Sequence, residues 1–183
     1  MPGHDVRLHE DDPVDATALA WLRERPGTPV EGIGVVTRIW RLAKLLGDDR
    51  RRTLADAGAD PATLDLLSVL RRSGVPYRLS TRDLTKRVRV TAGAVSQRVA
   101  RAEASGLVER TPSPDTARGV DVALTASGHA LVERLVDGVL GREADLIACL
   151  TAEEQGVLTD LLRSLLDALE SRLGNVDHTQ VGS

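Results

Sequence analysis

Apolar residues recur at three- and four-residue steps along most of this chain, which predicts a mainly helical protein. The longest such stretch covers residues 29–57 and carries two neighbouring apolar rows. They are Ile33, Val36, Trp40, Ala43 and Gly47, beside Val35, Ile39, Leu42 and Leu46. Because the apolar arc is so wide, we expect this helix to be covered on both sides. A shorter helix over residues 13–24 precedes it, with Asp12 as N-cap and Pro13 at the first helical position.

Three more helices are predicted before the chain changes pattern. Asp60 caps the first, which runs over residues 61–74. Ser80 and Asp83 have the spacing of a capping box and open a short second helix. Thr91 caps the third, which follows almost at once and ends near residue 105. The last two helices and the short link between them form a predicted helix-turn-helix.

The helix after Thr91 has two different faces. Val95, Val99 and Ala102 share the apolar one. The opposite face carries small or hydrogen-bonding residues that suit base edges in a major groove, namely Thr91, Gly93, Ser96, Gln97 and Arg101. Gln97 can pair with adenine, and Arg101 with guanine or a phosphate. The alternative is a solvated polar face, because this geometry also occurs in proteins that never touch DNA.

Two short strands are predicted next, over residues 107–111 and 120–124. The segment between them is rich in Pro, Ser and Gly, so we expect a rigid projecting hairpin in which Arg118 reaches a minor groove. The predicted fold class is therefore mainly α with a small β-hairpin wing, a winged helix-turn-helix.

The rest of the chain is predicted to form two helices. One covers residues 126–150, and the other begins at a capping box from Thr151 to Glu154. The second carries an apolar face that needs a partner, made of Leu158, Leu161, Leu162, Leu165, Leu166 and Leu169. The predicted organisation is a disordered acidic N-terminus (1–12), N-terminal helices of a dimerisation lobe (13–60), a DNA-binding lobe (61–125), C-terminal dimerisation helices (126–174) and a flexible tail (175–183).

Composition narrows the setting of the protein. The 183 residues are 42% hydrophobic, which suits one ordinary globular core. We find neither a signal peptide nor an apolar run long enough to cross a membrane, so we expect a cytoplasmic protein with no membrane contact. The single cysteine, Cys149, cannot form an internal disulfide, and we expect it to pack in the core.

Charge is segregated along the chain, although the net charge is only −3. Between Arg71 and Arg118 lie eleven Arg or Lys and four Asp or Glu, so the remainder is acidic. A basic middle between acidic ends is typical of a protein with one lobe facing phosphates. Ordinary solvated arginines would be the alternative.

In the order of its elements, the chain resembles the MarR family of transcriptional regulators over residues 30–173. The residues that carry the resemblance are Val95, Ser96, Gln97, Arg98 and Val99, then Gly106, Leu107, Val108, Glu109 and Arg110, and finally Arg118, Gly119, Val120, Leu124, Thr125 and Gly128. Two positions depart from the family pattern: Thr116 replaces the usual Asp two residues before Arg118, and Ala102 replaces a leucine.

The resemblance implies an intertwined homodimer joined by its N- and C-terminal helices, with double-stranded DNA as partner. Two-fold symmetry in turn implies a pseudo-palindromic operator. Family members are mostly repressors, and a minority are activators.

A narrower resemblance is to the urate-responsive subgroup, which has an extra N-terminal helix. It implies a ligand site made of Trp21, Asp65, Arg98 and Arg110. Tryptophan stacks on a planar ring, and arginines bind an anion such as urate. We expect Asp65 to pair with Arg98 when the site is empty. An anionic ligand would then compete with Asp65 for Arg98 and tilt the helix after Thr91, which is the DNA recognition helix.

Several alternatives to this ligand site stay open. Trp21 can simply pack its helix, with Asp65, Arg98 and Arg110 in a structural ion-pair cluster. Other anions, including tricarboxylates such as trans-aconitate, are further candidates within the resemblance.

Other classes of protein receive less support from the sequence. An enzyme is disfavoured because the four histidines have no zinc-ligand spacing, and phosphate-loop and nucleophile-elbow motifs are lacking. We expect no catalytic residue, no metal and no cofactor. A redox sensor would need a better placed thiol than Cys149. A winged domain used only for protein contacts would lack the steep salt dependence of phosphate binding.

Overall fold

The computed structural model describes residues 8–113 and 119–174. The chain forms two compact units, Met1–Asp49 and essentially all that follows from Arg50, and each is described by itself. The predictions for residues 1–7, for the tail from 175 and for Arg118 fall outside the described residues.

The first unit holds helix α1 (Pro13–Glu24) and most of helix α2 (Glu31–Asp56). Asp12 caps α1 as predicted, because its side chain accepts hydrogen bonds from the amides of Val14 and Asp15. The turn before α1, within the segment predicted to be disordered, is held by a hydrogen bond from the His9 amide to Asp15 Oδ2 (3.1 Å).

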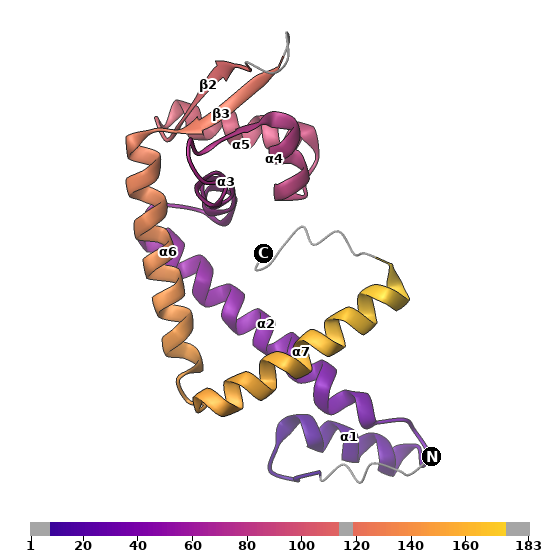
Figure 1. Cartoon of the computed structure of the whole chain (residues 1–183). Helices are drawn as coiled ribbons and strands as arrows, with labels where there is room; N and C mark the ends of the chain where they lie inside the picture. The colour runs from indigo at the N-terminus through magenta and orange to yellow at the C-terminus, as the bar shows by residue number, and fades with distance from the viewer. Residues whose placement is uncertain (1–7, 114–118, 175–183) are drawn as a thin grey trace. The chain divides into compact units, whose positions relative to one another are not determined.

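The predicted helix-turn-helix consists of helices α4 (Thr81–Val88) and α5 (Ala92–Ala104), and helix α3 (Pro61–Arg72) packs against both. All three helices lie near one end of α6 in Figure 1. Asp60, Ser80 and Thr91 act as N-caps, as the sequence predicts. Arg89, in the left-handed conformation with φ of 55°, ends α4 and starts the tight link to α5.

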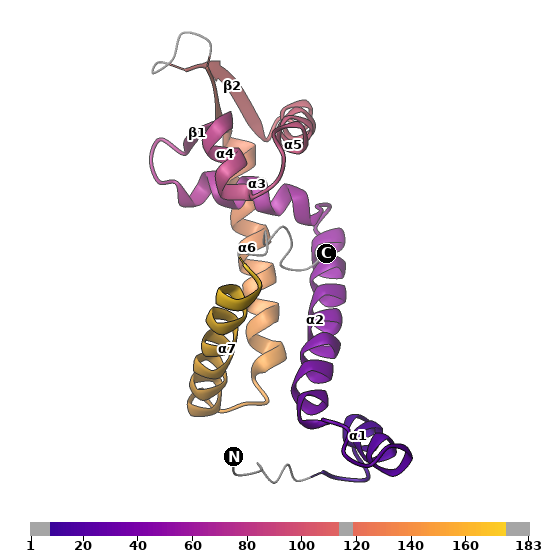
Figure 2. The ribbon, with the colours of Figure 1, turned by 90° about the vertical axis from the view of Figure 1, so that its right-hand side faces the viewer.

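The wing is part of a three-stranded antiparallel sheet in the order β1, β3, β2. Strands β2 (Val108–Pro112) and β3 (Val120–Leu124) agree with the predicted hairpin, which lies beside α4 and α5 (Figure 2). Strand β1 (Arg78–Ser80) was not predicted, because three residues carry too little alternation to stand out. It pairs with β3 so that Leu79 lies opposite Val122.

One core joins the three helices to the sheet. Its fully or nearly fully buried residues are Leu66, Leu67, Val69, Leu70, Leu84, Val95, Val99, Ala102, Val108, Val122, Leu124 and Val132. The predicted apolar stripe of α5 lies in this core. Val122 of β3 is buried, whereas Val120 is exposed, because Val120 stands at the outer end of β3 opposite Pro112.

Helix α6 (Ala126–Ile147) starts close against the wing. The Thr125 hydroxyl donates to the Gly106 carbonyl oxygen at 2.7 Å, and its amide donates to the Leu107 carbonyl oxygen at 3.1 Å. Gly128 is buried at this joint, where a Cβ atom would overlap the Leu107 carbonyl oxygen. A side chain of any kind is therefore excluded at this position.

Helix α7 (Ala152–Leu173) starts at the predicted capping box, in which Thr151 and Glu154 bond each other's backbone amides. None of its residues is buried, and its predicted leucine face is exposed in the single chain. Cys149, in the turn between α6 and α7, is exposed as well, so the prediction that it packs in the core is wrong. The turn places it beyond the last buried residue of α6, Val139. None of the described helices is long and apolar enough to cross a bilayer.

Candidate DNA interface and effector site

Helix α5 presents the candidate base-reading surface. Burial of Val95, Val99 and Ala102 fixes which side of the helix faces the core. The opposite side exposes all five predicted α5 contacts, Thr91, Gly93, Ser96, Gln97 and Arg101. Arg101 is the longest of them, with 67% of its side chain exposed. The surface combines small residues, which permit close approach, with one amide and one guanidinium group.

Helix α4 adds a basic face within the predicted basic segment, and its individual residues were not among the predicted DNA contacts. Leu84 is buried, whereas Arg82, Lys86, Arg87 and Arg89 are exposed. Guanidinium and ammonium groups beside a recognition helix are suited to phosphates, which position a protein on the duplex. The signal was present in the sequence, because these residues alternate with the core positions of one short helix.

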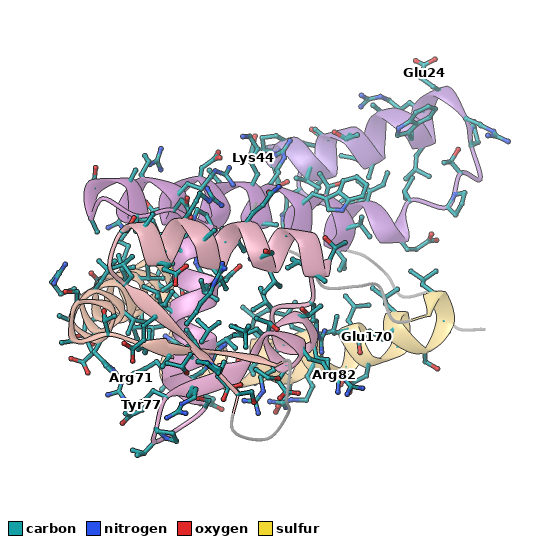
Figure 3. The ribbon with its side chains drawn as sticks, turned by 90° about the horizontal axis from the view of Figure 1, so that it is seen from above. Glu24, Lys44, Arg71, Tyr77, Arg82 and Glu170 are labelled. Carbon is teal, nitrogen blue, oxygen red and sulfur yellow. The ribbon has the colours of Figure 1, made fainter. Side chains whose placement is uncertain are left out.

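A groove of about 560 Å³ lies between α4, α5 and the wing. Its floor is apolar and includes Val95 and Val99, while Arg82, Lys86 and Arg110 are the cations along it. Arg82 is labelled in Figure 3. The groove adjoins the recognition helix, so any anion bound there would lie next to the candidate DNA surface.

Arg110, one of the four predicted ligand residues, connects strand β2 to the recognition helix. Its Nη2 donates to the Ser96 carbonyl oxygen at 3.4 Å, and its Nε lies 3.4 Å from Glu103 Oε2. Both partners belong to α5, more than one helical turn apart. Arg110 therefore holds the wing and the recognition helix together.

Asp65 and Arg98 form the expected ion pair between α3 and α5, with Arg98 Nη1 3.7 Å from Asp65 Oδ2. The Arg98 side chain is 17% exposed, and the same Nη1 atom is buried without a hydrogen-bond partner. Burial raises the pKa of Asp65 above its ordinary value, although the positive charge of Arg98 opposes this shift. The pair is thus incompletely satisfied, because a buried guanidinium normally donates short hydrogen bonds to its carboxylate.

The structure brings together two of the four predicted ligand residues. Asp65 and Arg98 are in contact, whereas Arg110 lines the groove on another side of α5. Trp21 belongs to the first unit, where it is half exposed on α1.

Within the first unit, α1 is fixed to α2 by a charged cluster. Arg38 Nη2 lies 2.9 Å from Asp12 Oδ2 and 3.0 Å from Asp15 Oδ1. The Asp15 side chain is almost completely buried, and bonding to both carboxylates raises the pKa of Arg38. This cluster sets the orientation of the helix that carries Trp21.

Another polar cluster lies where α3, β1 and α6 meet. Figure 3 labels Arg71 and Tyr77, and the Arg71 guanidinium lies 4.8 Å from the centre of the Tyr77 ring. Arg71 also bonds Glu133 of α6 at 3.0 Å, and Tyr77 meets His129 edge to face at 4.6 Å. The cluster fastens α6 to the DNA-binding lobe. Over residues 8–113 and 119–174, no three His, Cys, Asp or Glu side chains converge as a metal site would require.

Comparison with known proteins agrees with this architecture. A model described as the MarR family matches residues 57–119. The HTH-type transcriptional regulator PecS of Dickeya dadantii (strain 3937) is 28% identical over 155 residues, which are 85% of this chain and 91% of that protein.

Two solved structures share the fold. Sco3205, a MarR family transcriptional regulator from Streptomyces coelicolor solved in complex with DNA, is 30% identical with a TM-score of 0.64, covering 76% of this chain and 92% of that one. A variant of MarR from E. coli, complexed with operator DNA, is 27% identical with a TM-score of 0.59, covering 74% and 98%. These relatives are transcriptional regulators rather than enzymes. The winged fold, the family match and the similarity to Sco3205 together show that this chain belongs to the MarR family of transcriptional regulators.

Proposed function

We propose that this chain binds a pseudo-palindromic operator as a homodimer, represses transcription there, and is released by a small anionic ligand. The observation that carries DNA binding is the exposed polar face of α5 opposite its buried stripe. Sco3205 and MarR, which share the fold, were both solved with DNA, and this supports the same role here.

On the DNA side, Gln97 and Arg101 are assigned to base edges, and Thr91, Gly93 and Ser96 to close approach in the major groove. Arg118 is assigned to the wing contact. The basic face of α4 supplies phosphate contacts, which give affinity without sequence preference.

The proposed dimerisation is supported by apolar surface that a single chain leaves uncovered. On α7, the exposed apolar residues are Val157, Leu158, Leu161, Leu162, Leu165, Leu166, Leu169 and Leu173. These residues form an apolar face that extends over nearly five helical turns, and a contiguous exposed patch of this kind typically marks a protein contact. Its occupant is a second copy, because isologous pairing matches the symmetry of a palindromic site.

The proposed effector site uses Trp21, Asp65, Arg98 and Arg110. Its support is the loose Asp65–Arg98 pair, whose buried Nη1 atom lacks a hydrogen bond. An anion that replaces Asp65 would complete the bonding of Arg98, and it would shift α5, on which Arg98 stands. A thousandfold loss of operator affinity needs a difference of about 4 kcal/mol between the two states, which two charge-assisted contacts can supply.

The test of DNA binding uses duplexes that the protein itself selects from a random pool. We expect Arg101→Ala and Gln97→Ala to weaken binding to the selected duplex and to leave ligand affinity unchanged. Arg98→Gln and Trp21→Phe should weaken ligand binding more than DNA binding. Equal losses from both pairs of variants would contradict separate sites.

The test of the effector uses tryptophan fluorescence with urate, xanthine and trans-aconitate. A Trp40→Phe background leaves Trp21 as the only tryptophan. Saturable quenching that Arg110→Ala abolishes would support the site, and release of the selected duplex at the same concentrations would support antagonism. No quenching by any of the three would return the four residues to structural roles. A reporter gene behind the selected duplex then separates repression from activation.

A further inference from the structure

Asp60, the residue that caps α3, faces a base-reading arginine of α5. Its two carboxylate oxygens have different neighbours. Oδ1 accepts the amide of Thr63 at 2.7 Å and thereby caps the helix, whereas Oδ2 lies 3.8 Å from Nη1 of Arg101. A carboxylate is well suited to both places, because it also complements the positive end of the α3 dipole.

The contact is loose and accessible. Arg101 is 67% exposed and Asp60 is 50% exposed, and 3.8 Å exceeds hydrogen-bond distance. Both residues line a cavity of about 170 Å³ between α3 and α5, so the guanidinium has space to move without disturbing the core. Exposed pairs of this kind are weak and easily exchanged for another anion.

We propose that Asp60 is a positioning residue for Arg101, and that it makes DNA recognition more selective by competing with phosphates for this guanidinium. The inference rests on the proposed role of Arg101 in DNA binding. In the free protein, Asp60 occupies the place that a phosphate oxygen would take on non-specific DNA.

The two kinds of DNA contact respond differently to this competitor. A phosphate offers Arg101 a single charged contact in water, similar in strength to the pair with Asp60. A guanine at the right position offers two parallel hydrogen bonds to O6 and N7, which are stronger. Asp60 therefore lowers non-specific affinity by a larger factor than operator affinity.

The central variant is Asp60→Asn. Asparagine caps helices as well as aspartate, so it keeps the bond to the Thr63 amide while it removes the charge that faces Arg101. Melting temperature and helicity should stay close to those of the wild type. Asp137→Asn is the matched control, because it removes the same charge from an exposed position of α6.

The experiment measures binding to two duplexes of equal length, one selected by the wild-type protein from a random pool and one of scrambled sequence. Fluorescence anisotropy at several salt concentrations gives both affinity and salt slope. We expect Asp60→Asn to bind the scrambled duplex up to about fivefold more tightly, the range of one exposed ion pair, with a smaller gain on the selected duplex. The salt slope on scrambled DNA should steepen by up to about one unit, as for one added phosphate contact.

A double-mutant cycle assigns the effect to the pair. In an Arg101→Ala background, Asp60→Asn should give no more gain than Asp137→Asn. A gain that persists without Arg101, or unchanged binding of the scrambled duplex by Asp60→Asn, would overturn the inference while leaving the proposed function intact. A wild type that does not discriminate between the two duplexes would overturn the proposed function and the inference with it.

Discussion

Arg98 Nη1 and Asp65 Oδ2 stand 3.7 Å apart between the recognition helix and α3, and the nitrogen has no hydrogen-bond partner although it is buried. A pair in this state keeps most of the desolvation cost of its charges and gains little from contact. The raised pKa of Asp65 points the same way, since burial outweighs the attraction of Arg98. The contact therefore holds α5 in place without contributing much to folding stability.

Neutralising this pair should cost little stability. We expect Asp65→Asn and Arg98→Met each to change the free energy of unfolding by less than about 1 kcal/mol, because Asp65 is 49% exposed and solvent screens the interaction. Chemical denaturation at neutral pH measures both changes. A loss of several kcal/mol in either variant would mean that the pair is a structural anchor, which is the alternative to a ligand site.

The pH dependence of stability carries a signature of Asp65. Its pKa in the folded protein is raised by burial, so ionisation costs more in the folded than in the unfolded chain. Below both pKa values this cost is absent, and it develops as the pH rises through the folded pKa. We therefore expect wild type to lose stability relative to Asp65→Asn as the pH rises from below the ordinary pKa of an aspartate to neutrality. A difference that stays constant, or has the opposite sign, would contradict the raised pKa.

Most of the fold could be predicted from local signals, because its helices begin at strong caps. Asp12, Ser80 and Thr91 each cap the predicted helix, and the Thr151 capping box is complete. Strand β1 escaped prediction because its pairing with β3 is a long-range contact without a local pattern. Cys149 was wrongly predicted to be buried, because it lies in the turn before α7, a helix that has no buried residue within one chain.

The candidate site was less accessible from sequence than the fold. Spacing on α5 identified the exposed face correctly, because one buried stripe determines the other side of a helix. Arg110 contacts Glu103 and lines a groove with Arg82. Both placements depend on how β2 packs against α5. No periodicity encodes such packing between elements that are distant in sequence.

Gly128 should be among the least tolerant positions of the chain. A methyl group there would meet the Leu107 carbonyl oxygen, which is backbone and cannot move aside cheaply. We expect Gly128→Ala to destabilise the protein by about 1–3 kcal/mol or more through overpacking. Gly138→Ala on the same helix meets no atom within 4 Å and should be neutral or stabilising. Thermal unfolding of the two variants tests this contrast, and equal melting temperatures would contradict it.

The capping box of α7 should make this helix sensitive to acid. Hydrogen bonds from the Thr151 amide and hydroxyl lower the pKa of Glu154, so its ionised form favours the helix. This contribution is present above the ordinary pKa of Glu and is lost as the pH falls through the lowered value. Circular dichroism on acidification should show a smaller loss of helix in Glu154→Gln than in wild type. The same acid-induced loss in both proteins would assign it to other carboxyl groups.

The exposed leucines of α7 predict that the chain exists as a dimer whose stability depends on them. Leu162 lies near the middle of the apolar stretch, and Ser164, two residues further along α7, points about 160° away from Leu162 around the helix. Burying one leucine side chain contributes about 1.5–3 kcal/mol, and a two-fold symmetric interface contains each leucine twice. Leu162→Glu should therefore raise the dimer dissociation constant by at least about a hundredfold. Ser164→Glu introduces the same side chain and should leave the dimer intact. Sedimentation velocity over a range of concentrations distinguishes the two, and a Leu162→Glu protein as dimeric as the Ser164→Glu control would exclude this face as the subunit contact.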